Sequence, residues 1–295
     1  MVPLKPVTIH VRTINDDPKD FDALFSFWNQ LNDDFLDVTF DFTHCNFLRQ
    51  NAVAFLGGLA RLVQYRSGKV NFLWNTLEDA ILTNLAQNGF GEAFGLDVSS
   101  WTGNSIPYRQ DILFEQKGLT DYLKWNWLGR GWVHMSENLR DAITCKVLEC
   151  YLNAFEHSGS SIGVFSCGQH YPQLKALKIA IVDFGIGIPA NVRSFKNNPL
   201  IGTEQALEWA FQSGTTTKPN GLGRGLGLDL LKQFVRVNKG RMEIFSHDGY
   251  AVFEENREEY SRRSSFFEGT LIHITLKCDE KYYSLASETM PEYYF

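Results

Sequence analysis

The stretch LECYLNAFEHSG, residues 148–159, places polar side chains on one face of an otherwise apolar helix. Glu149, Asn153 and His157 are spaced four residues apart, so they lie one above the other along a helix. One interpretation is the solvent-facing side of an amphipathic helix. The other is a polar cavity, lined by a carboxylate and an amide at a fixed spacing. The rest of the chain decides between the two.

A second polar cluster follows an apolar strand. The stretch IAIVDFGIGIP, residues 179–189, leads from the strand directly into Asp183, Gly185 and Gly187. A carboxylate at a strand end can accept a hydrogen bond from an exocyclic amine, and glycine lets a flat ring approach the backbone. A plain strand-to-helix turn with a structural aspartate is the alternative.

A third stretch, GLGRGLGLDLL at residues 221–231, alternates glycine with other residues immediately before a helix. Backbone N–H groups of such a loop, together with the helix N-terminus, form an anion site suited to phosphates. The spacing fits neither the Rossmann motif nor the P-loop, and a flexible linker is the alternative. Thr217 and Lys218, just upstream, supply a hydroxyl and a cation within reach of a phosphate chain.

The order of the three stretches is more specific than any one of them. E-x-x-x-N on a helix, D-x-G-x-G after a strand and G-x-G-x-G-L-G-L before a helix together resemble the GHKL superfamily. That superfamily holds the ATP sites of gyrase, heat-shock chaperones, mismatch-repair ATPases, histidine kinases and anti-sigma-factor kinases. The resemblance covers roughly residues 136–277. It implies a two-layer α/β (Bergerat) sandwich with a mostly antiparallel sheet, in which ATP lies between the helical layer and a mobile lid.

Carried over by position, the resemblance assigns roles to individual residues. Glu149 would be the general base, and Asn153 would coordinate Mg²⁺ beside the phosphates. Asp183 would bind the adenine amine, with Gly185 and Gly187 beside the ring. The other residues implied to contact the nucleotide are Thr217, Lys218, Gly221, Gly223, Arg224, Gly225, Leu226, Gly227 and Thr270. Phe211 matches the place of a lid aromatic.

Within the superfamily, ECYLNAFEHS most resembles the box of anti-sigma-factor serine kinases. This resemblance implies an Mg²⁺–ATP-dependent protein kinase or slow ATPase in bacterial signalling. The alternative is an ATP-gated interaction switch without phosphotransfer. Glu149 favours turnover, because a pure binder needs no base. Autophosphorylation on histidine is not expected, since no heptad helix presents a histidine.

Residues 1–100 alternate strand and helix signals, and their pattern resembles a STAS domain, the fold of anti-sigma-factor antagonists. Where the antagonists carry a phosphorylated serine at a helix start, this chain has Gln50 and Asn51. A module that docks a protein partner is therefore expected, rather than a substrate for the kinase. Residues 101–135 are expected to connect it to an ATP-binding domain at 136–278, with a tail at 279–295.

Composition and charge bear on which partners and which compartment this protein has. The 295 residues carry a net charge of −6 with scattered Lys and Arg, which argues against a nucleic-acid surface. No run approaches the roughly 18 apolar residues of a membrane span. Five cysteines without a C-x-x-C pair indicate reduced thiols in a cytoplasmic protein. The charge-dense stretch 254–265 is expected to be a solvated loop. A homodimer is left open.

Overall fold

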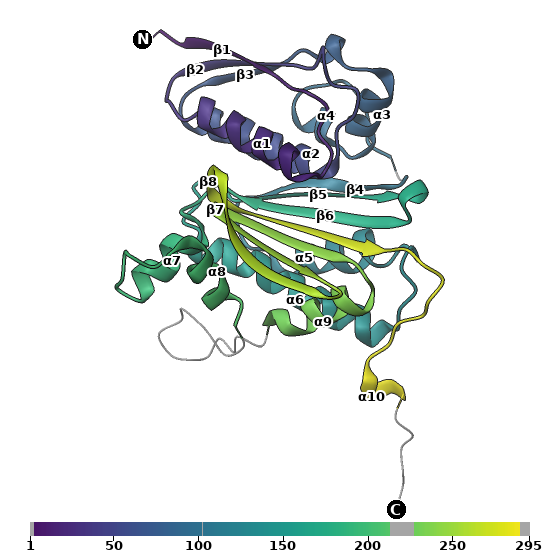
Figure 1. Cartoon of the computed structure of the whole chain (residues 1–295). Helices are drawn as coiled ribbons and strands as arrows, with labels where there is room; N and C mark the ends of the chain where they lie inside the picture. The colour runs from purple at the N-terminus through teal and green to yellow at the C-terminus, as the bar shows by residue number, and fades with distance from the viewer. Residues whose placement is uncertain (1–2, 102, 213–226, 290–295) are drawn as a thin grey trace, which may run out of the picture.

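Two sheets and two layers of helices build this chain. The computed structural model describes residues 3–101, 103–212 and 227–289. The layers are stacked in the order sheet, helices, sheet, helices (Figure 1). Strands follow the order β1-β2-β3 in the upper sheet and β4-β5-β6-β8-β7 in the lower one, and every pair in the lower sheet is antiparallel. The predicted α/β fold class is confirmed.

The upper layer is a small parallel sheet with its two crossover helices. Its strands are β1 (Lys5–His10), β2 (Leu36–Asp41) and β3 (Lys69–Phe72). Parallel neighbours need a crossover connection, which α1 (Pro18–Gln30) and α2 (Gln50–Tyr65) provide. The layer closes with η1 (Trp74–Thr76), α3 (Asp79–Gln87) and α4 (Phe90–Ala93).

Helix α1 carries its own start signals. Asp17 is the N-cap, Pro18 takes the first helical position, and the Asp20 carboxylate accepts a hydrogen bond from the Asp17 N–H at 3.2 Å. Phe21 and Phe25, four residues apart, both lie in the core. The run Asn-Asp-Asp-Pro at residues 15–18 is typical of a loop, so the N-cap within it is not obvious from the sequence.

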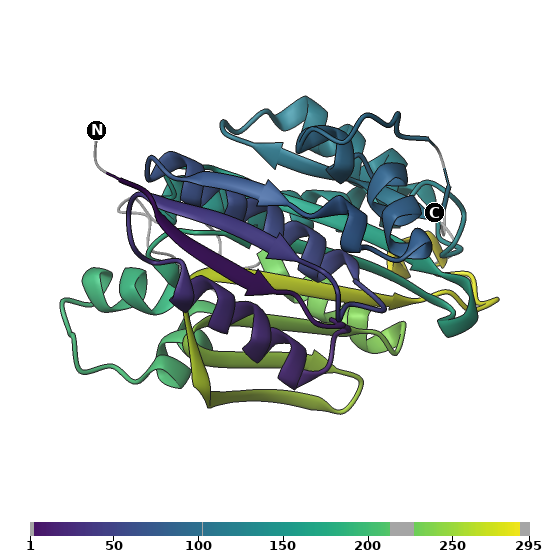
Figure 2. The same cartoon turned by 90° about the horizontal axis from the view of Figure 1, so that it is seen from above.

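Helix α2 lies between the two sheets and is enclosed on all sides, since every residue from Gln50 to Ala60 is buried. It packs on β5 and β6 of the lower sheet while α1 packs on β8, as seen from above in Figure 2. Phe25 and Phe55 place their ring centroids 5.3 and 5.0 Å from that of Phe267 on β8. The upper layer and the lower sheet therefore share one hydrophobic core.

The lower sheet is the larger one, and each of its faces is covered. Its strands are β4 (Ser105–Asp111), β5 (Val164–Tyr171), β6 (Ala176–Asp183), β7 (Arg241–Glu254) and β8 (Arg257–Lys277). The helices below it are α5 (Gln116–Asp121), η2 (Tyr122–Trp127), α6 (Glu137–His157) and α9 (Gly227–Val237). The remaining elements are η3 (Pro172–Leu174), α7 (Gly187–Phe195), α8 (Thr203–Ala210) and α10 (Ala286–Thr289).

Residues 101–135, expected to connect two domains, contribute structure to the lower half. Strand β4 pairs antiparallel with β5, from Ser105 opposite Gln169 to Asp111 opposite Val164. Helix α5 and the π-helical η2 then turn back under the sheet. An edge strand with a half-exposed face has no continuous apolar run, which is why its sequence resembles a polar linker.

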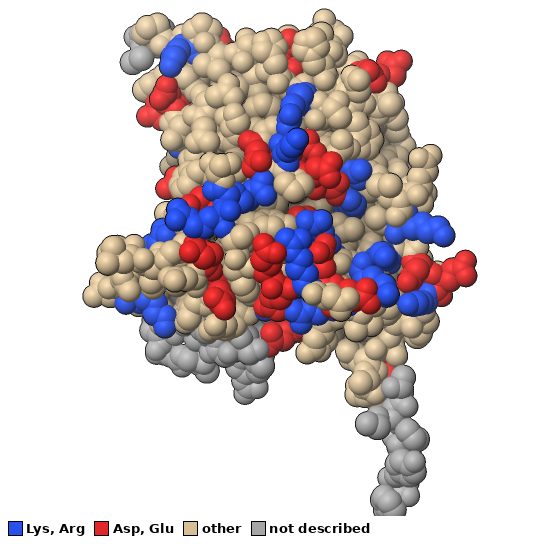
Figure 3. All heavy atoms as spheres, in the orientation of Figure 1, with Lys and Arg blue, Asp and Glu red and all other residues tan. Residues whose placement is uncertain are grey.

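The expectation of a solvated loop at residues 254–265 is wrong. Strand β8 begins at Arg257 and pairs with β7, from Glu254 opposite Arg257 inward. Opposite charges across the hairpin stabilise it, as in the 2.8 Å contact between Arg262 Nε and Asp248. Figure 3 shows basic and acidic side chains interspersed over the face of the molecule that it presents. The dense charges belong to a strand pair exposed to solvent.

Candidate functional site

Helix α6 carries the first predicted motif and is well defined at its start. The Ser136 hydroxyl caps it by accepting a hydrogen bond from Leu139 N–H at 3.1 Å. Ile143, Val147 and Tyr151 are buried under the lower sheet. This packing leaves the other face of the helix, with its polar stripe, outside the core.

Two side chains of the polar stripe, Glu149 and Asn153, are accessible to solvent. The Glu149 side chain is 42% exposed and forms an ion pair with Lys146 at 2.9 Å. Asn153, one turn further, is exposed. His157 ends the helix, and its carbonyl accepts a hydrogen bond from the Asn191 side chain of α7 at 2.8 Å. Glu149 and Asn153 are thus free to meet a ligand, whereas His157 takes part in fixing α7.

Asp183 is the most perturbed carboxyl group near this helix. It ends β6, is 4% exposed, and its Oδ1 accepts a hydrogen bond from Gly185 N–H at 3.0 Å. Burial raises the pKa of Asp183 to about 7, against hydrogen bonds from Gly185 and Thr270 that lower it. Thr270 lies directly opposite Asp183 in the β6–β8 pair. The structure therefore brings these two predicted residues together.

The two glycines after Asp183 are explained by close packing of the backbone. A Cβ on Gly185 would lie 2.0 Å from the carbonyl oxygen of Ser158, which follows α6. A Cβ on Gly187, whose φ is +73°, would lie 2.2 Å from the carbonyl oxygen of Glu268. The Ile186 N–H also donates to Ser158 at 2.7 Å. Gly185 lets the chain after β6 lie against the end of α6, and Gly187 lets the start of α7 lie against β8.

Ser246 on β7 is a residue of this site that the motifs do not reveal. Its hydroxyl donates to the carbonyl of Gly269 at 2.9 Å and accepts from the N–H of Ile188 at 3.0 Å. It lies 3.4 Å from the Thr270 hydroxyl. A single serine thus links β8 to the start of α7. Nothing in its local sequence, RMEIFSH, distinguishes it from a strand serine.

Most of the predicted phosphate-binding residues lie outside the described part of the chain. These are Thr217, Lys218, Gly221, Gly223, Arg224, Gly225 and Leu226. Gly227 is the first residue of α9, which packs beside α6. On the other side, Phe211 packs its ring on Phe253 in the core, and its carbonyl accepts a hydrogen bond from Lys232 of α9 at 2.7 Å. Phe211 therefore ties the end of α8 to α9.

The residues described at this end of the molecule fit a nucleotide with Mg²⁺. A buried carboxyl lies at the sheet, and an exposed amide and carboxylate lie on the neighbouring helix. Among residues 3–101, 103–212 and 227–289, no group of three or more His, Cys, Asp or Glu side chains is placed to hold a metal ion. Mg²⁺ is commonly held by one or two protein ligands together with phosphates and water, so a single side chain such as Asn153 would be enough to hold it beside a nucleotide.

The first two residues of α2 are buried and cannot be reached by a protein partner. Gln50 and Asn51 are 1% and 0% exposed. The Gln50 side chain accepts a hydrogen bond from Tyr171 at 2.8 Å, and its amide nitrogen lies 2.9 Å from His273 Nε2. His273 in turn contacts Glu243 at 3.3 Å. The position where the expected STAS resemblance would place a phosphorylated serine is therefore part of the buried contact between the two layers.

Comparison with known proteins agrees with the site. Residues 141–280 match the model of the family described as histidine kinase-, DNA gyrase B-, and HSP90-like ATPase. A search of curated proteins finds no match to the chain. Among the described helices, none combines the length and the apolar character needed to cross a bilayer.

Proposed function

We propose that this chain, whose residues 141–280 form a GHKL-type ATPase domain, is an Mg²⁺–ATP-dependent regulatory enzyme. Its reaction would be phosphate transfer to a protein serine or slow ATP hydrolysis, in bacterial signalling. The observation that carries the proposal is the pairing of buried Asp183 with Thr270 beside the helix that bears Glu149 and Asn153. A reducing cytoplasm fits its free cysteines, including buried Cys45, Cys150 and Cys167.

The described residues support separate roles in binding and transfer. Asp183 would accept a hydrogen bond from the adenine amine, and Thr270 and Ser246 would hold it in place. Asn153 would contact Mg²⁺, which neutralises charge on the phosphate oxygens when bound. Glu149, exposed on the same helix face, would accept the proton of an attacking hydroxyl or water. Its ion pair with Lys146 orients the carboxylate.

The second candidate is an ATP-gated interaction switch. The contact of Lys232 with the Phe211 carbonyl favours it, because that contact joins the two ends of the glycine-rich segment. ATP bound there could change the surface offered to a partner without any chemistry. In either case we propose that the STAS-like upper layer recruits the partner. Its available surface is the outer face of the small sheet, where Thr8, Thr39 and Asn71 form one row, rather than the start of α2.

Incubation of the purified chain with [γ-³²P]ATP, alone and with host lysate, separates these functions. A kinase labels a lysate protein, an ATPase releases labelled phosphate, and a switch binds ATP without either product. Binding alone, together with ATP-dependent capture of a partner, would favour the switch. No binding of ATP in the presence of Mg²⁺ would contradict the proposal as a whole.

Replacing Asp183 with asparagine tests the adenine assignment. Asp183→Asn is expected to weaken ATP binding by about 10- to 100-fold, because the charge-assisted hydrogen bond is lost. The affinity for inorganic pyrophosphate is expected to stay the same, since the phosphates contact other residues. Isothermal titration calorimetry measures both, with Asp34→Asn, an exposed aspartate in the upper layer, as the matched control. Equal weakening of both ligands would refute the role of Asp183 at the base.

The pKa of Asp183 makes ATP binding depend on pH. The folded value of about 7 lies above the ordinary 3.8, so this group favours the folded state fully below pH 3.8 and loses that contribution as the pH rises through 7. A donor amine from adenine favours the ionised form instead. ATP affinity is therefore expected to be about tenfold higher at pH 8 than at pH 6.

The phosphates of ATP also titrate near neutrality, so the same measurement is made on Asp183→Asn. The variant retains the phosphate contribution and is expected to lose the additional tenfold dependence. Identical pH profiles for the two proteins would show that ionisation of Asp183 does not accompany binding.

A further inference from the structure

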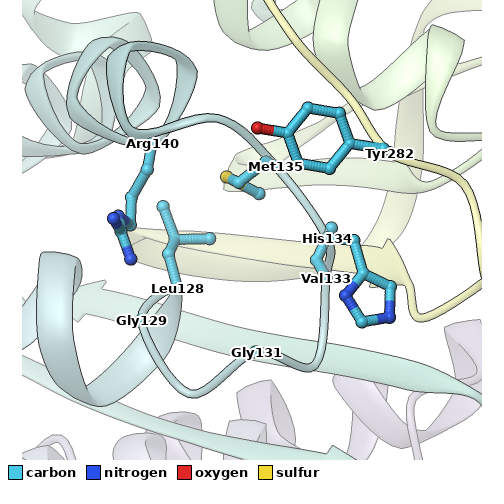
Figure 4. Close-up of a pocket in the computed structure, with 8 residues that line it drawn as sticks. All are labelled: Leu128, Gly129, Gly131, Val133, His134, Met135, Arg140 and Tyr282. Atoms are coloured by element: carbon cyan, nitrogen blue, oxygen red, sulfur yellow. The ribbon is translucent and has the colours of Figure 1, made fainter.

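A cavity of about 170 Å³ lies at the other end of α6, away from the candidate nucleotide site. The loop of residues 128–135 surrounds it, the first turn of α6 contributes Arg140, and Tyr282 closes it from the segment that follows β8 (Figure 4). Leu128 and Val133 are buried in its wall, and Met135 adds a further apolar side chain. The cavity is thus lined by these apolar side chains together with the imidazole of His134 and, at one side, the guanidinium of Arg140.

The walls of the cavity are held from two directions. The Leu128 N–H donates to Leu123 at 3.0 Å, which fixes the loop to η2. Ser136 N–H donates to the Tyr283 carbonyl, and Tyr283 N–H donates to the His134 carbonyl, both at 2.9 Å. These paired bonds join the end of the loop to the C-terminal segment. The cavity is therefore formed before any ligand arrives, which reduces the entropic cost of binding.

Arg140 has a cationic group without an anionic partner. Its Nε atom is buried and has no hydrogen-bond partner among the described residues. Its guanidinium lies 5.4 Å from the ring centre of Trp125, and no described carboxylate forms an ion pair with it. Its neighbour Lys124, in contrast, binds Asp141 at 2.6 Å. A ligand in the cavity cannot reach this buried Nε, but the Arg140 side chain as a whole is partly exposed, and a carboxylate can bind a guanidinium through two parallel hydrogen bonds.

The volume limits what can accompany that carboxylate. Pockets for drug-sized ligands and cofactors occupy roughly 300–1,000 Å³, whereas an apolar cavity of about 150 Å³ accepts a single benzene ring. A cavity of about 170 Å³ therefore has room for one ring or a short branched chain. We propose that it binds a small free carboxylate of this size, with Arg140 holding the charge and Leu128, Val133 and Met135 enclosing the apolar part.

Titration of the full-length protein with benzoate tests this proposal. Amide NMR signals of Gly129, Gly131 and Leu139 are expected to shift with a dissociation constant on the order of 1 mM. Benzamide, which lacks the charge, and inorganic phosphate, which lacks the ring, are each expected to bind at least tenfold more weakly. Phosphate binding as tight as benzoate would mean that the apolar wall contributes nothing and would overturn the assignment.

Two variants separate the contribution of the Arg140 charge to benzoate binding from the contribution of the space in the cavity. Arg140→Gln is expected to weaken benzoate at least tenfold, whereas Arg257→Gln, an arginine on the distant β7–β8 hairpin, is expected to leave it unchanged. Val133→Phe fills the cavity and is expected to abolish benzoate binding with Arg140 still present. Thermal melting checks that each variant is folded. Unchanged benzoate affinity in folded Arg140→Gln, or no shift of the three amides in the unmodified protein, would refute the proposal.

Discussion

Glu149→Gln is expected to leave Mg²⁺–ATP bound and to lower its turnover by about 10²- to 10⁴-fold, whereas Asn153→Ala is expected to abolish Mg²⁺–ATP binding. The two residues share one helix face, but their expected roles differ. The carboxylate of Glu149 acts on the nucleophile, so its loss affects the chemical step. The amide of Asn153 contacts the metal, so its loss affects the bound state before any step occurs.

Calorimetry with Mg²⁺ present measures binding, and release or transfer of labelled phosphate measures turnover. Glu137→Gln supplies a matched control, because it removes an exposed carboxylate from the first turn of the same helix. That control is expected to change neither quantity by more than a factor of two or three. Wild-type turnover in Glu149→Gln would exclude the general-base role and favour the ATP-gated switch.

The parts of the site that could be predicted are those defined by residues close together in the sequence. Glu149 and Asn153 share a helix face through their four-residue spacing, and Ser136 caps the helix that carries them. Asp183 ends a strand whose eight residues are all buried, and the apolar run that leads to it, IAIV, is visible in the sequence. In each case the residues that define the feature are neighbours in sequence or one helical turn apart.

The parts that could not be predicted depend on partners distant in sequence. Ser246 joins the site only because β7 and β8 pair, which brings it to Gly269 and Thr270. Gly185 and Gly187 suggested space for a ring, yet the structure fills the space beside each with a backbone carbonyl. The need for glycine was correct, and its cause lies in the crossing chain segments, which the sequence does not reveal.

The relation between the upper layer and the lower sheet is the main point that the sequence did not convey. Residues 1–100 resemble a separate module, and α2 shows the apolar content of an ordinary core helix. Only the structure shows that its second face packs on β5 and β6. A helix that is apolar all round signals burial on both sides. The upper layer and the lower sheet therefore bury a common core, and we expect them to behave as a single folding unit.

Phe55→Ala is therefore expected to destabilise both layers together, by about 3–5 kcal/mol. Phe55 is fully buried on α2, and its ring centroid lies 5.0 Å from Phe267 of β8 and 5.3 Å from Phe184, next to Asp183. Its removal leaves a cavity at the contact between the two layers. Urea unfolding gives the free-energy change, and Tyr65→Ala, an exposed position on the same helix, is expected to cost less than about 1 kcal/mol.

Hydrogen exchange measured by mass spectrometry shows which parts of the chain share that loss. If the core is shared, peptides from β2 and α2 and peptides from β6 and β8 lose protection by the same free energy in Phe55→Ala. Loss of protection confined to the upper layer, with β6 and β8 unchanged, would mean that the lower sheet is stable without α2. The lower half would then fold on its own, and the upper layer could detach from it as an independent module.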